Sequence, residues 1–504
     1  MVQTYTHKFD TTLYKGSVTV KTGFFIDGQW ADPVDGAGDK VEVVDPTYGK
    51  VITTIIGGGP RDVDLAVQAA RKAFKTSWGL KVPGSQRGRI LDKFADLLES
   101  HSEELAALLS LDVGKPFSST RQFEVSTAVK IVRYYAGWAD KIHGKTIETN
   151  ERKLAYTRHE PFGVVGAIIP WNSPLISAVG KLAPAIATGN TVILKPSELT
   201  PLTTLFIADL FNEAGFPPGV LNLVNGYGHT VGSALSLHPN VDKISFTGST
   251  LTGRNILKAA AESNLKSVTL ELGGKSPTIV FNDAVLDQAI KWAAHGIFYN
   301  MGQACIAGSR IYVQEDVYDK FLDGFTTFTK ELTSAIGHPF EASTRHGPQV
   351  SKAQFDRVMG YIASGKSEGA QVHIGGESFG EEGYFIKPTI FVDVKPYMKI
   401  MREEIFGPVC SIVQFKTEDE VIEWANDTTY GLAANILTEN SARAIRMAHA
   451  LEAGIIYINS AMAGDINVPF GGYKQSGMGR EMGEEALDTY TQIKAVHVNL
   501  GQEL

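Results

Sequence analysis

Cysteine is scarce in this sequence, and so are other features that would assign a chain to a special class. Only Cys305 and Cys410 occur in 504 residues, which excludes a disulfide framework and gives no support to a metal cluster. No apolar run is long enough to span a bilayer. Residues 1–10 lack a signal or transit pattern, and residues 501–504 are no retention or peroxisomal signal. We expect a cytoplasmic protein with no membrane partner and no bound metal.

Positive charge is also outweighed by negative charge. Lys and Arg number 47 against 55 Asp and Glu, which gives a net charge of −8 and argues against nucleic acid as a partner. Hydrophobic residues make up 43% of the chain, as in ordinary globular proteins. Because the length exceeds that of a single core, we expect two or three domains.

The amino-terminal part contains short strands and packing helices. Residues 25–30 are the first segment with an ordered pattern, and the residues before it resemble a loose arm. Short strands are predicted at 41–44 and 51–54. Asp62 is expected to cap a helix, and a second amphipathic helix carries apolar residues at helical spacing over 90–98.

From residue 164 onward, short apolar strands alternate with helical patterns. The predicted strands are 164–169, 191–195, 220–224, 243–246 and 268–271. This alternation predicts an α/β fold whose Rossmann-like parallel sheet has crossover helices. Such a sheet binds ligands outside the carboxyl ends of its strands. Each strand here ends in a polar or glycine-rich cluster, so we expect these loops to face one crevice.

A second α/β region is predicted at about 279–472. Its strands include 309–313 and 409–415, and its helices lie near 317–332 and 418–425. The tail at 486–498 ends in a strand-like alternation. Because an isolated terminal strand needs a partner, we expect it to add to a sheet across subunits.

Cys305 is the candidate nucleophile because it lies in a small, glycine-flanked segment. A thiolate is a strong nucleophile near neutral pH. A lone cysteine is more often a small buried apolar residue, and we interpret Cys410, within an apolar run, in that way. Composition leaves both interpretations of Cys305 open.

Two other residues suit acid–base and oxyanion chemistry. Glu271 ends an apolar strand, where partial desolvation would raise its pKa toward that of a general base, although a solvated strand end is the commoner situation. Asn172 follows another strand, and its amide could donate to a developing oxyanion or belong to a simple turn.

Two glycine-containing segments could hold a dinucleotide. Residues 226–232 resemble a dinucleotide loop, but the last glycine is wrongly spaced. Residues 248–253 open a helix after a strand, so their N–H groups could bind a pyrophosphate. Lys195 and Glu198 could bind ribose hydroxyls, or they could be solvated surface residues.

These clusters together resemble the aldehyde dehydrogenase superfamily, collinearly over about residues 25–498. Residues 271–277 are similar to its glutamate motif and residues 298–305 to its cysteine motif. The other matching segments, in family order, are 170–172, 195–198, 246–249, 404–408 and 469–472.

The resemblance implies three parts. These are an NAD-binding domain at 20–138 and 161–271, an α/β catalytic domain at 272–478, and a small β oligomerisation element at 139–160 and 485–504. It further implies a homodimer or homotetramer.

The resemblance also implies an oxidation through a thioester on Cys305. Asn172 would hold the oxyanion, Glu271 would activate the hydrolytic water, and Glu481 would relay its proton. NAD is preferred over NADP because Glu198 would lie beside the 2′-hydroxyl. The residues implied for the cofactor are Ile168, Ile169, Pro170, Trp171, Lys195, Ser197, Glu198, Gly228, Gly232, Phe246, Gly248, Ser249, Thr252, Leu272, Gln354, Glu404 and Phe406.

The substrate tunnel departs from the common family pattern. Small residues stand where the family often has bulky ones, at Ser173, Ser177, Gly180 and Gly464. Ala304, Ile306 and Phe470 are expected to line the same tunnel. Because small residues widen a tunnel, our hypothesis is a preference for bulky aldehydes, such as an aryl or indolyl aldehyde, over acetaldehyde.

Two alternatives compete with this interpretation. A CoA-acylating dehydrogenase would use the same cysteine, but a general base at Glu271 argues against it. The second alternative is a non-catalytic binding or structural protein with the same fold, since fold alone does not establish function. The joint presence of Cys305, Glu271 and Asn172 argues against that alternative.

Overall fold

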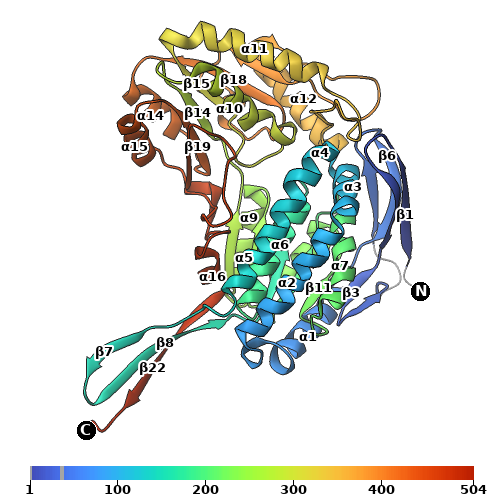
Figure 1. Cartoon of the computed structure of the whole chain (residues 1–504), viewed down its shortest axis with the longest axis vertical. Coiled ribbons are helices and arrows are strands. Elements are labelled where there is room, and N and C mark those ends of the chain that lie inside the picture. Colours follow the sequence, from blue (N-terminus) through green and yellow to red (C-terminus); the bar gives the residue numbers. More distant parts are fainter. Residues whose placement is uncertain (1–2, 35–38) are drawn as a thin grey trace.

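The computed structural model describes residues 3–34 and 39–504. Helices and strands alternate over most of the chain, and two large sheets with flanking helices form the body (Figure 1). The predicted α/β fold class is confirmed. Within the described residues, no helix has both the length and the apolar character that a membrane crossing requires.

The first sheet has eight strands in the order β21-β13-β12-β9-β10-β11-β3-β4. Its strands are β3 (Phe24–Ile26), β4 (Gln29–Ala31), β9 (Val164–Ile168), β10 (Thr191–Lys195), β11 (Leu221–Leu223), β12 (Lys243–Thr247), β13 (Ser267–Glu271) and β21 (Gly477–Met478). The pairings among β9 to β13 are all parallel, as predicted. Along the chain, β10 and β11 are added on one side of β9, and β12 and β13 are then added on the other side. The carboxyl end of β9 is therefore a switch point, where α/β sheets bind ligands.

Helices cover this sheet because their apolar residues fall on one side. They are α1 (Pro60–Thr76), α2 (Gly84–Ser100), α3 (Ser102–Val113), α4 (Phe117–Ser119), α5 (Ser126–Trp138), α6 (Pro174–Ala187), α7 (Leu202–Ala214), α8 (Ser233–Leu237) and α9 (Thr250–Glu262). The prediction that Asp62 caps a helix is confirmed, although Asp62 lies in the first turn of the helix and not before it. α1 begins at Pro60, a residue favoured in a first turn, and the Asp62 carboxylate accepts the N–H of Gly59 at 2.9 Å from within the helix.

The second sheet has seven strands in the order β16-β17-β18-β15-β14-β19-β20. These strands are β14 (Pro277–Val280), β15 (Arg310–Gln314), β16 (Gln371–Ile374), β17 (Thr389–Val392), β18 (Val409–Phe415), β19 (Ala433–Leu437) and β20 (Ile455–Ile458). Its helices are α10 (Leu286–Phe298), α11 (Tyr318–Ser334), α12 (Lys352–Ser367), α13 (Lys399–Arg402), α14 (Glu418–Asn426) and α15 (Ser441–Ala450). The strands and helices predicted here are confirmed within a few residues.

The expectation of a loose arm before residue 25 was wrong. β1 (Thr4–Asp10) and β2 (Lys15–Lys21) form an antiparallel hairpin, and its buried residues Phe9, Val18 and Val20 join the core under the first sheet. Polar residues fill the alternate positions, so only every second side chain is apolar. The two strands predicted at 41–44 and 51–54 are confirmed as β5 (Lys40–Asp45) and β6 (Lys50–Ile56), and they pair as a second hairpin.

A three-stranded sheet projects from the body in Figure 1. It consists of β7 (Thr146–Asn150), β8 (Lys153–Pro161) and β22 (Thr491–Asn499), in the order β22-β8-β7, and α16 (Glu485–Thr489) precedes its last strand. The strand predicted in the tail is confirmed as β22 and has a partner within its own chain, whereas its addition to a sheet across subunits stays a prediction. β22 pairs with β8 along its whole length, because both strands leave the body at the same place.

Candidate active site

A cavity of about 150 Å³ lies at the carboxyl ends of β9, β12 and β13, next to the second sheet. Three predicted catalytic residues line it, namely Cys305, Glu271 and Asn172. Predicted cofactor residues line the same cavity, namely Pro170, Trp171, Gly248, Ser249, Leu272, Gln354, Glu404 and Phe406. Thr247, Gly273 and Arg357 complete the wall, and the sequence analysis missed them.

Cys305 follows α10 and a tight turn at residues 299–302. Its side chain is partly exposed, whereas Cys410 is buried in β18, as expected. Burial raises the pKa of the Cys305 thiol, and the nearby Glu404 and Glu271 raise it further. Hydrogen bonds from the main-chain N–H groups of Cys305 and Ile306 to the sulfur lower the pKa of the thiol. The thiol therefore stays protonated unless a base or a positive charge acts on it.

Glu271 lies at the end of β13 and is 4% exposed. Both of its carboxylate oxygens are buried without a hydrogen-bond partner among the described residues. Burial raises its pKa well above the ordinary value, Glu481 raises it further, and Lys181 and Arg480 lower it. A carboxylate whose pKa is raised in this way binds a proton more readily, which suits a general base.

Glu481 lies behind the cavity wall rather than in it. Its carboxylate is in contact with the ammonium of Lys181, a fully buried residue of α6. Lys181 also lies 3.3 Å from Ser245 Oγ. Main-chain bonds to Phe470 hold Glu481 in place. The sequence analysis missed Lys181, although a lysine on an apolar helix signals a buried ionic partner.

Asn172 is fixed by a hydrogen bond from its Nδ2 to the main-chain oxygen of Gln303, at 3.0 Å. Gln303 is two residues before Cys305 and is fully buried. Because a side-chain amide nitrogen carries two hydrogens, one N–H of Asn172 remains available to the cavity.

Glu404 and Phe406 approach the cavity from the loop before β18. Oε1 of Glu404 accepts the N–H of Gly274 at 3.0 Å, and burial raises the pKa of Glu404 to about 7. A Cβ at Gly273 would lie 2.4 Å from Oε2 of Glu404, so a larger residue there would displace the Glu404 carboxylate. The Phe406 ring packs edge-on against Trp171, with centroids 5.2 Å apart.

The remaining predicted cofactor residues lie further along the carboxyl edge of the first sheet. Lys195 is buried rather than solvated, and its Nζ lies 3.2 Å from Oε2 of Glu198. Burial lowers the pKa of Lys195. As predicted, α9 opens directly after β12, with Ser249 as its capping residue. The others are Ile168 and Ile169 at the end of β9, Ser197 after β10, Gly228 and Gly232 before α8, Phe246 in β12, and Thr252 in α9.

The residues predicted for the tunnel do not line this cavity. Ser173 caps α6, which carries Ser177 and Gly180. Ala304 and Ile306 flank Cys305 in the sequence. Phe470 forms main-chain hydrogen bonds with Glu481. A Cβ at Gly464 would lie 3.2 Å from the hydroxyl of Tyr457. Burial raises the pKa of Tyr457 to about 12, and Cys305 adds to this effect.

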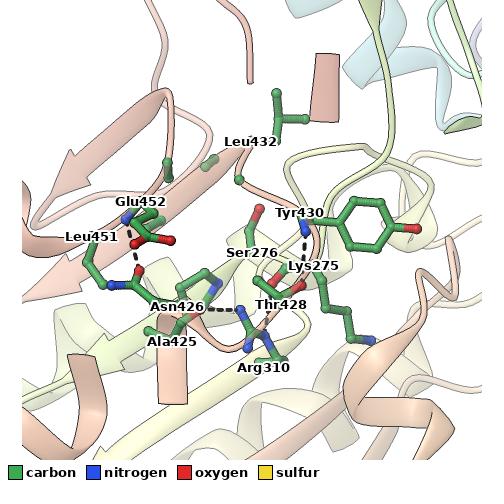
Figure 2. Close-up of a pocket in the computed structure, with 15 residues that line it drawn as sticks. Lys275, Ser276, Arg310, Ala425, Asn426, Thr428, Tyr430, Leu432, Leu451 and Glu452 are labelled. Atoms are coloured by element: carbon green, nitrogen blue, oxygen red, sulfur yellow. Dashed lines mark hydrogen bonds between the residues drawn. The ribbon is translucent and has the colours of Figure 1, made fainter. Parts of the chain in front are cut away.

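A second, nearly filled pocket lies behind the loop that follows Glu271 (Figure 2). Arg310 is buried in it and donates to the main-chain oxygens of Lys275 and Ala425, at 2.9 and 2.8 Å. Its space is only about 10 Å³, so it accommodates no substrate. The Lys275 side chain extends away from Arg310 (Figure 2). The hydrogen bond from Arg310 to Lys275 therefore fixes the loop that follows Glu271.

Known proteins match this chain over its whole length. The sequence model of the aldehyde dehydrogenase family matches residues 33–496. An aldehyde dehydrogenase of Agaricus bisporus is 54% identical over 504 residues, which is 100% of both chains. The NAD+ complex of an aldehyde dehydrogenase from Bacillus cereus superposes with a TM-score of 0.93 and 46% identity, covering 95% of this chain and 97% of that one.

An indole-3-acetaldehyde dehydrogenase of P. syringae, solved with NAD+ and IAA, has a TM-score of 0.93 and 40% identity. The match covers 96% of this chain and 97% of that one. With the family model, the relatives and the cavity in agreement, the chain belongs to the aldehyde dehydrogenase family, and it is an oxidoreductase that acts on aldehydes.

Proposed function

We propose that the protein oxidises a bulky aldehyde to a carboxylic acid with NAD, through a thioester on Cys305. The observation that carries this proposal is the single cavity shared by Cys305, Asn172 and Glu271 with the candidate cofactor residues. A nucleophile, an oxyanion donor and a base beside one cofactor groove are the parts that the oxidation requires.

In the proposed reaction, Glu271 takes the thiol proton of Cys305 and passes it on, and the sulfur bonds to the aldehyde carbon. The carbonyl oxygen becomes an oxyanion held by the amide of Asn172 and the N–H of Cys305. When bound, NAD supplies the acceptor for the hydride that the substrate carbon loses. Glu271 then takes one proton from water as the water oxygen attacks the thioester carbon. The C–S bond breaks, the product leaves as the carboxylate, and the second proton of the water restores the Cys305 thiol. Glu481 and Lys181 pass the proton taken by Glu271 away from the cavity.

The residues present fit a dinucleotide. The first turn of α9 presents main-chain N–H groups suited to a pyrophosphate, and Lys195 with Glu198 suits the adenine ribose. Glu404, in its tight fit against Gly273, suits the nicotinamide ribose. The Bacillus cereus relative was solved with NAD+, which supports NAD here. The Glu198 carboxylate disfavours a 2′-phosphate.

The preference for a bulky aldehyde rests on the small residues of α6 and of the loop before Phe470. A Cβ at Gly180 would meet only the tip of Met482, at 3.3 Å. The name of the P. syringae relative refers to an indolyl aldehyde, which supports the same substrate class.

We also propose a division of the chain into three functional parts. Residues 20–138 and 161–271 would hold the cofactor, 272–478 would complete the catalytic site, and 139–160 with 485–504 would join subunits. Exposed apolar side chains on the projecting sheet, at Ile147, Leu154, Ile493 and Val498, support a homo-oligomer formed there. Two free thiols suit a reducing compartment, so we propose the cytoplasm.

The test mixes protein, NAD and aldehyde and follows NADH by absorbance, with Cys305→Ala as the control. We expect NADH to form without CoA, and kcat/KM to be higher for an aryl or indolyl aldehyde than for acetaldehyde. Absence of NADH, or a requirement for CoA, would overturn the reaction. A clear advantage for acetaldehyde would overturn the substrate class.

A further inference from the structure

The turn before Cys305 has a strained backbone. Asn300, Met301 and Gly302 follow one another with φ of 48°, 56° and 72°, in the left-handed region. Glycine adopts this conformation freely and asparagine tolerates it, but methionine rarely does. A turn of this kind persists only when surrounding contacts fix it.

The side chain of Asn300 supplies such contacts, and they lead to the oxyanion donor. Asn300 is 8% exposed. Its Nδ2 donates to the main-chain oxygen of Asn172 at 3.2 Å and to that of Gln303 at 3.0 Å. The Gln303 oxygen also accepts Nδ2 of Asn172, so the two side-chain amides share one acceptor.

Asn172 is therefore held at two points. Asn300 binds its main chain directly, and the Gln303 oxygen binds its amide. Gln303 is fixed in turn, because its N–H donates to the Asn300 oxygen at 2.9 Å and its Oε1 accepts the N–H of Val350 at 3.0 Å. The second N–H of Asn172 thus has a defined direction, and Asn172 lines the cavity.

We propose that Asn300 is a positioning residue that sets the free N–H of Asn172 against the oxyanion of the reacting aldehyde. This inference rests on the proposed function, since it assigns a role within the same oxidation. Asn300 touches neither substrate nor cofactor in this role. It acts through Asn172, because a donor must be aimed before the charge develops if it is to stabilise the transition state.

The test is a double-mutant cycle with Asn300→Asp and Asn172→Ala. Aspartate keeps the shape and tolerates left-handed backbone, but it replaces the Nδ2 donor with an oxygen that faces two carbonyl oxygens. We expect Asn172→Ala to lower kcat/KM about 100-fold to 1,000-fold, and Asn300→Asp to lower it about 10-fold to 100-fold. The KM for NAD should not change.

The matched control is Asn222→Asp. Asn222 is also buried, and its Nδ2 also donates to two main-chain oxygens, of Val192 and Gly219. It lies in β11, away from the cavity, so kcat/KM should stay near that of the original protein. Thermal unfolding of each variant reports folding, and Asn300→Gly, which keeps the backbone freedom, replaces Asn300→Asp if that variant does not fold.

The decisive result is the effect of Asn300→Asp in the Asn172→Ala background. We expect little further loss there, because the group that Asn300 positions is already absent. The rate at which iodoacetamide alkylates Cys305 should also be unchanged. A fully additive loss, or altered alkylation, would overturn the role through Asn172. If Asn172→Ala alone left activity intact, the proposed function would fail instead, so the two failures are distinguishable.

Discussion

A Cβ at Gly471 would lie 2.8 Å from Oε1 of Glu271, and equally close to Cδ of Arg480 and to the main-chain oxygen of Gly479, so the carboxylate of the proposed base leaves no room for a side chain at this glycine. Gly471 belongs to the loop that also binds Glu481 through Phe470. The loop therefore fixes both acidic groups of the proposed proton path.

Gly471→Ala should slow hydrolysis of the thioester more than its formation, because the methyl group crowds Glu271 and the Gly479–Arg480 segment next to Glu481, and it does not approach Cys305 or Asn172. We expect kcat to fall about 10-fold, as part of the 100-fold or more that a general base contributes. Rapid-mixing measurements should still show a burst of NADH before the slow steady state. Gly137→Ala, where a Cβ meets no atom within 4 Å, is the control. Loss of the burst would contradict this prediction.

The charges behind Glu271 should shift the pH dependence of kcat in opposite directions. Glu481 raises the pKa of Glu271, so Glu481→Gln should lower it and move the acidic limb of the profile to lower pH. Lys181 lowers this pKa, so Lys181→Met should move the limb to higher pH. Activity rises with pH through the limb because the base acts in its deprotonated form. Glu485→Gln, an exposed residue, is the control, and shifts of the same sign in both variants would contradict the proposed path.

Cofactor choice should depend on the pair formed by Lys195 and Glu198, whose charged atoms lie 3.2 Å apart. Glu198→Gln removes the negative charge that repels a 2′-phosphate and frees the Lys195 ammonium to bind it. We expect kcat/KM for NADP to rise about 10-fold relative to that for NAD. Steady-state assays with both cofactors measure this ratio. An unchanged ratio would mean that the ribose lies elsewhere.

A larger side chain at Gly180 should narrow the proposed tunnel. The nearest obstacle to a Cβ there is the flexible tip of Met482, so Gly180→Leu should be accommodated by the fold. We expect kcat/KM for an aryl aldehyde to fall about 10-fold to 200-fold, and that for acetaldehyde to change less. Equal losses for both aldehydes would indicate a general defect rather than a narrower tunnel.

A buried ion pair beside the tunnel residues should matter for stability. Lys115 and Glu124 contact each other with side chains 3% and 1% exposed, and Nζ of Lys115 also lies 3.1 Å from Ser173 Oγ. Lys115→Met leaves a buried carboxylate without its cation, so we expect a loss of about 3–5 kcal/mol in unfolding free energy. Denaturant titration measures it. Lys141→Met breaks an exposed pair and should leave the unfolding free energy nearly unchanged.

Much of the first sheet could be predicted from the sequence, because β9 to β13 are short apolar runs that alternate with helices. The hairpin of β1 and β2 was missed, although the alternation of apolar and polar residues in it is typical of half-buried strands. The grouping of Cys305, Glu271 and Asn172 followed from motif order rather than from any local feature of Cys305.

Contacts between distant segments were beyond the sequence analysis. Lys181 carries no motif, and its partner Glu481 lies far along the chain. The hydrogen bonds of Asn300 depend on a left-handed turn, which the secondary-structure propensities of these residues do not predict. The role of the tunnel residues remains a prediction, because they lie outside the cavity that holds Cys305.

The position of β21 in the sequence means that the first sheet is completed late in the synthesis of the chain. This strand borders β13 at the edge of the first sheet, yet it is made after the whole second sheet. Glu481 follows it, and β22 comes last. A nascent chain still on the ribosome therefore carries Cys305 and Glu271 long before the segment that would complete the proposed proton path. Complete translation is thus a condition for turnover, and a fragment cut short before Gly477 should be inert.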